Sequence, residues 1–342
     1  MRRAWSGVAL AAVLVVAGVA AWIWVAADRP GSPAAGPAAP ASPVAAASPV
    51  AARVTVPGKP RQLAADAGGL WVVGDGGLHR IDPAADQVVA SVPVGPPNAD
   101  LGGLGLSATS VWVPQERSEV LWRVDRRTNR VRDRVDLGQV LYGPVGVATS
   151  GDTVWVVCCG LKYGARPAGT LLRVDGRRGE VTGRVPVPEG PLAVAAGDDA
   201  VWVGTAAGSL LRFDPDTARV VTRVAPPDPR GRIQALSPGP GVLWVADTGA
   251  GAIRRFDLAS GRFTLAVTAP APRNLAAGPD GAYVVTDLNQ LLSQVHARTG
   301  RRGPTIPATQ LGAVRGIAVE PGAVWVATGD QVVRLDPARI PT

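Results

Sequence analysis

Cysteine, histidine and charge are all scarce in this chain. Its 342 residues include two Cys, two His and one Met, and only 18% of them are charged. Two Cys exclude a disulfide-stapled scaffold and a cysteine-rich zinc module, and two His leave little room for a histidine metal site. The low charge, together with 46% hydrophobic residues, also excludes a charge-rich disordered protein.

Glycine, proline and tryptophan are abundant by contrast. The 42 Gly and 32 Pro disfavour a helical bundle, because these are the two poorest helix formers. Ten Trp stand against three Phe and three Tyr, a ratio that suggests a regular use of Trp. The formal net charge of +8 comes almost entirely from Arg, since Lys59 and Lys162 are the only lysines.

The N-terminal segment, residues 1–29, is predicted to be a signal anchor. Ala4 to Ala27 contain no charge, and about 20 apolar residues suffice for a helix to cross a bilayer. Arg2 and Arg3 precede this run, so the positive-inside bias predicts a single-pass cell-membrane protein whose C-terminal domain lies outside the cytoplasm. The alternative is a cleaved signal peptide ending at Val25-Ala26-Ala27, which would give a secreted protein.

Residues 30–51 form a predicted linker that is rich in Pro and Ala and has no aromatic or charged side chain. Such a sequence is extended and semi-rigid, and it has no core to bury. We therefore expect residues 52–342 to form the folded domain.

One phrase returns seven times after the linker: a small turn, an apolar–Trp–Val strand, an Arg–apolar–Asp strand end and an alternating Val-rich strand. Successive copies lie about 42 residues apart, a period typical of β-propeller blades with four short strands. The seven copies are centred on Trp71, Trp112, Trp155, Trp202, Trp244, Tyr283 and Trp325.

The two ends of the repeat region complement each other. The last copy ends after its third strand, Gln331–Leu335, whereas Ala52–Pro57 forms a predicted strand with no blade before it. Joining the two removes the free edges. The sequence therefore predicts an all-β fold, a seven-bladed β-propeller whose N-terminal strand closes the last blade. In the sixth copy, the predicted third strand is Gln290–Val295.

Six copies share an Arg and an Asp at the end of the third strand. These pairs are Arg80/Asp82, Arg123/Asp125, Arg173/Asp175, Arg212/Asp214, Arg255/Asp257 and Arg334/Asp336. An Asp carboxylate before a tight turn can accept backbone N–H groups, so we predict structural roles for all twelve residues. In the sixth copy His296 takes the place of the Asp and is expected to be a turn residue, and His79 is expected to be exposed.

The repeated phrase, VWV…L-x-R-x-D-P, resembles the YVTN-type and virginiamycin B lyase-like seven-bladed propellers over nearly the whole predicted domain. The streptogramin lyases of that group eliminate across an ester with a metal-supported His/Glu constellation on one face of the ring. Here His79 and His296 both fall at third strands, and neither has a paired Glu. The resemblance therefore supplies no catalytic residue, and no cofactor or metal is expected.

Two further features leave alternatives open. Cys158 and Cys159 are adjacent and follow a Trp–Val strand, so they are either two free thiols that point to opposite faces or a strained vicinal disulfide. Aspartates that follow the Trp–Val strands could gather a calcium ion, although repeated turn Asp is more often structural. These aspartates are Asp75, Asp247, Asp287 and Asp330.

The main functional signal is positional. The residue ten places before each central Trp or Tyr begins the inner strand of its blade, near one mouth of the central channel. Three consecutive blades of the closed ring carry arginine there, and the fifth blade has an arginine two residues earlier. The predicted ligand-binding residues are Arg61, Arg232, Arg273, Asn274 and Arg315. Arginines at a partly desolvated mouth favour a carboxylate or a phosphate.

The sequence thus predicts a membrane-anchored extracytoplasmic propeller, monomeric, that binds or senses a small anionic ligand or another extracytoplasmic protein. The alternatives are a C–O lyase similar to the streptogramin lyases, and a protein–protein interaction scaffold. Nucleic acid is not expected as a partner, because the chain has no nucleic-acid-binding motif.

Overall fold

A computed structural model describes residues 48–140, 143–160, 168–197, 199–225, 227–286, 291–306 and 308–340. By backbone contacts the chain divides into two units, of which the second begins at Ala47. The predicted anchor, residues 1–29, and the linker up to residue 47 lie outside the described residues. Within the described ranges, no helix has the length and apolar character needed to cross a membrane.

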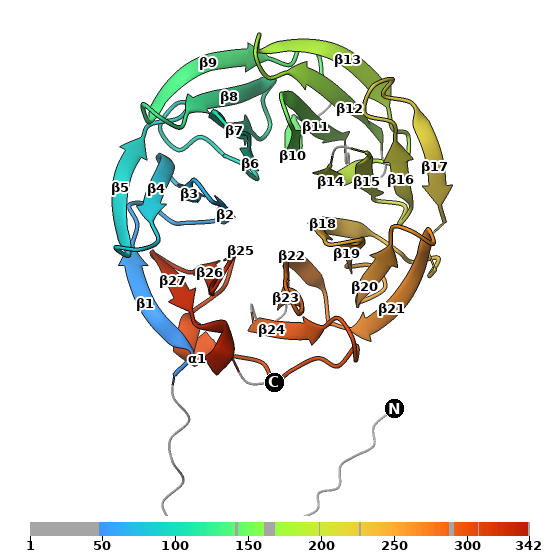
Figure 1. Ribbon diagram of the computed structural model, residues 1–342. Helices are drawn as coiled ribbons and strands as arrows, with labels where there is room; N and C mark the ends of the chain where they lie inside the picture. Colours follow the sequence, from blue (N-terminus) through green and yellow to red (C-terminus); the bar gives the residue numbers. More distant parts are fainter. Residues whose placement is uncertain are drawn as a thin grey trace, which may run out of the picture. The chain divides into compact units, whose positions relative to one another are not determined.

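The second unit is a ring of seven antiparallel sheets, as the sequence predicts (Figure 1). Blades one to three comprise β2 (Gln62–Asp66), β3 (Gly69–Gly74), β4 (Gly77–Asp82) and β5 (Gln87–Val92); β6 (Gly105–Leu106), β7 (Ser110–Gln115), β8 (Val120–Asp125) and β9 (Arg130–Asp136); and β10 (Pro144–Ser150), β11 (Thr153–Gly160), β12 (Ala168–Asp175) and β13 (Glu180–Pro186). Blades four and five comprise β14 (Pro191–Ala196), β15 (Val201–Thr205), β16 (Leu210–Phe213) and β17 (Val220–Val224); and β18 (Ile233–Gly239), β19 (Val242–Asp247), β20 (Ala252–Asp257) and β21 (Arg262–Thr268).

Blades six and seven complete the ring. They comprise β22 (Pro272–Gly278), β23 (Gly281–Thr286) and β24 (Leu291–His296); and β25 (Gly316–Glu320), β26 (Ala323–Ala327) and β27 (Gln331–Leu335), with two short helical segments, α1 (Ala308–Leu311) and η1 (Pro337–Arg339). The third strand of blade six therefore ends one residue later than predicted, and the predicted first residue, Gln290, lies outside the described residues. In the part of the chain that is described, blade six has three regular strands, and isolated bridges at Arg302 and Ile306 partly cover its outer edge.

An N-terminal strand closes the ring. β1 (Val50–Thr55) pairs antiparallel with β27 of blade seven, with Arg53 opposite Val333. The strand begins two residues earlier than the predicted Ala52, because Val50 already pairs with Leu335 across a register irregularity. On the inner side, β2 of blade one contacts β25 of blade seven, so the inner strands run around a common centre.

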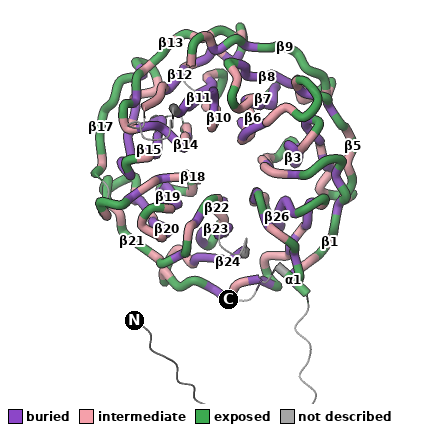
Figure 2. The backbone as a smooth tube through the Cα atoms, turned by 180° about the vertical axis from the view of Figure 1, so that it is seen from behind, coloured by how far each residue is buried: buried purple, intermediate pink, exposed green. Residues whose placement is uncertain are grey.

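The central Trp or Tyr of each blade packs in the apolar layers between blades. Trp71, Trp112, Trp155, Trp244 and Trp325 are essentially fully buried, and Tyr283 takes the same place in blade six. Each apolar cluster joins two neighbouring blades; Trp71 and Leu78 of blade one, for example, pack against Val113 of blade two. The buried residues follow the second and third strands, whereas the outermost strands are largely exposed (Figure 2).

The predicted Arg and Asp pairs have structural roles. Asp125 Oδ1 accepts the N–H groups of Arg127 and Thr128 at 3.0 and 2.7 Å, and the other five aspartates accept equivalent turn N–H groups. The Arg123 guanidinium lies 5.1 Å from the centre of the Trp112 ring and donates to the Arg177 carbonyl of the next blade. Arg80, Arg123 and Arg173 thus join their blades to the turn of the next one.

The prediction that His79 is exposed is wrong. Its side chain is only 4% exposed, and Nδ1 lies 2.9 Å from Ser91 Oγ on the neighbouring strand. Burial lowers the pKa of the His79 imidazole. The error arises because the residue alternates toward the apolar seam between blades one and seven instead of toward solvent.

Candidate functional site at the channel mouth

The central channel contains a cavity of about 1310 Å³. All seven residues at the predicted inner-strand position line it: Arg61, Gly102, Val145, Leu192, Gln234, Arg273 and Arg315. The other predicted ligand-binding residues, Arg232 and Asn274, line the same cavity. The structure thus brings the whole predicted set together at one place.

A repeated backbone irregularity lies at this position in four blades. The pairing of the first two strands skips one residue at Val145, Leu192, Gln234 and Arg273. A bulge residue is left out of the ladder, and its side chain is re-aimed. The bulge thus places side chains of different chemistry at equivalent points around the mouth.

Arg61 is held by two carboxylates. Its Nη2 lies 2.8 Å from Asp75 Oδ1, and its Nη1 lies 2.8 Å from Asp100 Oδ1 of blade two. Arg117 adds a longer contact, 3.9 Å from its Nε to Asp100 Oδ2. Its two terminal nitrogens already bind carboxylates, so Arg61 offers a ligand much less positive charge than its position in the sequence suggests.

Glu116 is an ionisable group of the cavity that the sequence did not single out. It lines the cavity beside Asp100 and Arg117. Burial and then the neighbouring Asp100 carboxylate raise the pKa of the Glu116 carboxyl, against the opposing effect of Arg117 and Arg61. No repeated motif marks Glu116, because it lies in a hairpin loop where the blades differ.

The arginines of blades five and seven are in a different situation from Arg61. In the part of the chain that is described, no carboxylate pairs with the guanidinium of Arg232 or Arg315. The Arg232 backbone is fixed by its hairpin, because Asp247 Oδ1 accepts its N–H at 2.9 Å. Arg273 is exposed at the mouth and has further interactions of its own.

Blades six, seven and one approach one another closely at this mouth. Asn274 Nδ2 donates to Gln62 Oε1 at 3.0 Å, so side chains of blades six and one meet beside blade seven. A methyl group added at Gly316 would lie 2.3 Å from the Arg61 carbonyl oxygen. Only glycine permits this approach, which sets Arg315 next to Arg61.

The two cysteines lie on opposite sides of β11. Cys158 packs in the apolar cluster between blades two and three, whereas Cys159 lines the cavity. Both are free thiols in the structure, the first of the two alternatives that the sequence leaves open. Burial raises the pKa of the Cys158 thiol to about 12; it also raises the pKa of the Cys159 thiol, although the Arg232 guanidinium acts in the opposite direction.

The aspartates considered for calcium are engaged separately. Asp75 pairs with Arg61, and Asp247 is buried against Arg254 at 3.1 Å, while Asp287 lies outside the described residues. Among the residues that are described, no group of three or more His, Cys, Asp or Glu has a metal-binding arrangement. Asp330 is exposed, and its backbone carbonyl accepts the N–H of Val56.

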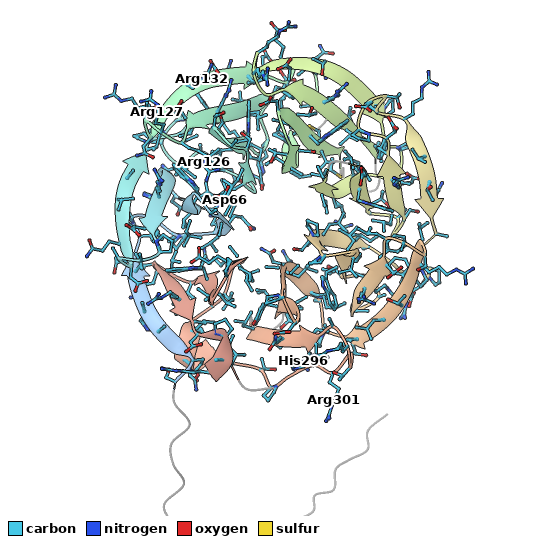
Figure 3. The ribbon with its side chains drawn as sticks, viewed as in Figure 1. Asp66, Arg126, Arg127, Arg132, His296 and Arg301 are labelled. Carbon is cyan, nitrogen blue, oxygen red and sulfur yellow. The ribbon has the colours of Figure 1, made fainter. Side chains whose placement is uncertain are left out.

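Neither histidine lies at the channel mouth. His79 is buried on the third strand of blade one, and His296 ends β24 toward the outer rim (Figure 3). At the opposite end of the inner strands, Asp66 is held by Arg126, whose Nη1 lies 2.7 Å from Asp66 Oδ2 (Figure 3). At that end of the cavity the Asp66 carboxylate is therefore neutralised by the Arg126 guanidinium.

Comparisons with known proteins support the architecture alone. No protein-family model matches the chain, and no curated protein matches it. Among solved structures, the crystal structure of the computationally designed Ika8 protein is similar, with a TM-score of 0.61 and 13% identity over 83% of this chain and 98% of that one. The fold is a seven-bladed β-propeller. The resemblance to YVTN-type and virginiamycin B lyase-like propellers remains a prediction.

Proposed function

We propose that this propeller is a binding or sensing module that takes a small anionic ligand with an apolar portion at the channel mouth. The observation that carries the proposal is the convergence of Arg232, Arg273 and Arg315 on one cavity, opposite apolar side chains at the equivalent positions of other blades. Concave sites with apolar walls and a few convergent polar groups are the usual form of small-molecule sites.

The anionic group belongs at blades five to seven. Arginine binds carboxylate and phosphate through paired N–H donors, and its charge-assisted hydrogen bonds are stronger than neutral ones. Asn274 adds an amide to this side of the mouth, already oriented by Gln62. Arg61 contributes less, because Asp75 and Asp100 balance its charge.

The apolar portion belongs at blades three and four. Val145 is partly buried, and Leu192 is 8% exposed and lines the cavity. Burying apolar ligand surface here contributes free energy of about 25 cal/mol per Å² of area removed from water.

The cellular setting is also a proposal and rests on the sequence. The uncharged run from Ala4 to Ala27 supports a single-pass anchor with the propeller outside the cytoplasm, and the linker of residues 30–51 supports a spacer between them. A surface partner on the same face is compatible with this arrangement, because a propeller face offers loops on rigid blades.

Calorimetry with three matched probes tests the proposal on the isolated ring, residues 47–342, and on the full chain in detergent. Phenyl phosphate has both features of the ligand, inorganic phosphate has only the charge, and phenol has only the apolar ring. We expect phenyl phosphate to bind more tightly than either partial probe, and Arg315→Ala to weaken it. Equal affinities for all three probes, or no binding of phenyl phosphate, would refute the proposal.

A further inference from the structure

One turn of the ring lacks the carboxylate that the others share. In five blades an Asp side chain accepts N–H groups of the turn that follows the third strand; in blade four, Asp214 Oδ1 accepts from Asp216 and Thr217 at 3.1 and 2.7 Å. Asp336 accepts one such N–H, from Ala338, at 2.9 Å. In blade six His296 stands at this place.

The blade-six turn keeps the same backbone shape without that carboxylate. Gly300 N donates to the His296 carbonyl at 2.9 Å, as Gly179 N does to Asp175 at 2.8 Å in blade three. The N–H groups of Arg298 and Thr299 correspond to those that Asp accepts elsewhere. Both residues are exposed, and no acceptor for either N–H lies within the described ranges.

Three arginines lie in this turn or directly after it. Arg298, Arg301 and Arg302 are exposed, and within the described residues none of them forms an ion pair. Asp280 meets the turn through its backbone carbonyl, which accepts the N–H of Ala297 at 2.8 Å, and its carboxylate has no hydrogen bond with a described residue. Figure 3 shows His296 and Arg301 at this part of the rim.

Blade five, which precedes blade six, also donates no arginine hydrogen bond to the blade-six turn among the described residues. Arg80, Arg123 and Arg173 each donate to a backbone carbonyl in the turn of the following blade. Arg255 of blade five is the equivalent residue, but it donates to Thr264 of its own blade at 3.0 Å. Its Nε is buried without a partner in the structure. Arg212 of blade four likewise donates within its own blade, to the Asp199 carbonyl, so the missing carboxylate is what sets the blade-six turn apart.

We propose that this turn is an oxyanion site, in which a carboxylate or phosphate group takes the place of the missing Asp. The N–H groups of Arg298 and Thr299 donate to its oxygens, the side chains of Arg298 and Arg301 supply charge, and the His296 ring supplies a further donor. The site lies on the outer rim, away from the channel, and does not depend on the proposed ligand of the channel.

Inorganic phosphate is the probe for this site, in a protein that carries Arg232→Ala, Arg273→Ala and Arg315→Ala so that these arginines of the channel do not contribute. The melting temperature is followed against phosphate, with sodium chloride at matched ionic strength as reference. We expect a saturable rise with phosphate beyond that with chloride. Amide resonances of Arg298 and Thr299 should shift over the same concentrations.

Three variants in this background decide the assignment. His296→Asp supplies the turn's own carboxylate, so it should raise the melting temperature without phosphate and abolish the phosphate response. Arg298→Ala should weaken the response severalfold, whereas Arg127→Ala, the same turn position in blade two, should leave it unchanged. A response that persists in His296→Asp, or no response beyond chloride in the parent, would overturn the proposal while leaving the channel site untouched.

Discussion

The two halves of the channel mouth use one structural position for opposite chemistry. Blades two, three and four place Gly102, Val145 and Leu192 there, whereas blades six and seven place Arg273 and Arg315. Both halves use the same β-bulge, because the strand pairing leaves out Leu192 in blade four and Arg273 in blade six. A repeat architecture can therefore build an asymmetric site from symmetric parts, with one substitution per blade.

Arg61 sharpens this comparison, because it occupies the same position but belongs to neither half. Two carboxylates bind its terminal nitrogens, one from its own blade and one from blade two. The residue type at the repeated position therefore does not determine the charge that a ligand meets. The neighbours contributed by the loops determine it.

The largest effect is expected from removing two of the three arginines that converge on the cavity. Arg232→Ala with Arg315→Ala should weaken phenyl phosphate binding by a factor of about ten or more, since each charged hydrogen bond contributes about 1.5–3 kcal/mol. Phenol binding should not change. Calorimetry measures both probes, and a matched loss of phenol affinity would show that the double variant disturbs the fold.

The apolar half should give a smaller effect on a different probe. Leu192→Ala removes apolar contact, so phenyl phosphate should bind about three- to tenfold more weakly, while inorganic phosphate binding stays as in the parent. Calorimetry with both probes checks this split. If both affinities fell together, the division of the mouth into two halves would be wrong.

Removing a carboxylate partner from Arg61 should leave its positive charge available to an anionic ligand. Asp100→Asn removes one of its two carboxylates, so inorganic phosphate should bind about two- to threefold more tightly, at a cost of up to about 1 kcal/mol in the free energy of unfolding. Phosphate titration and urea unfolding measure the two quantities. Unchanged or weaker phosphate binding in this variant counts against charge compensation at Arg61.

The smallest effect concerns pH and Glu116. Its pKa is raised in the folded state, so the folded protein favours the protonated form, and ionisation costs stability as the pH rises through that value. Anion binding should strengthen modestly as the pH falls and Glu116 loses its charge. Glu116→Gln should flatten this dependence. At pH values above the pKa of Glu116, the variant should also have a higher free energy of unfolding than the parent. An unaltered pH profile of anion binding would exclude a role for Glu116.

The blade count and the arginine positions could be predicted from the sequence, because a spacing set by Trp71, Trp112 and their counterparts repeats along the chain. The ion pairs of Arg61 could not. Asp100 lies in a loop where the blades do not repeat, 39 residues away from Arg61. His79 was misplaced for a related reason: its environment is the closing seam, where segments from the two ends of the chain meet.

A crystal structure of the ring with phenyl phosphate tests the central claim most directly. The account predicts the phosphate oxygens within hydrogen-bond distance of Arg232 or Arg315, with the phenyl ring turned toward Val145 and Leu192. A phosphate bound at Asp100 and Arg61 with the ring toward blades five to seven would contradict it, as would a channel without the ligand at saturating concentration.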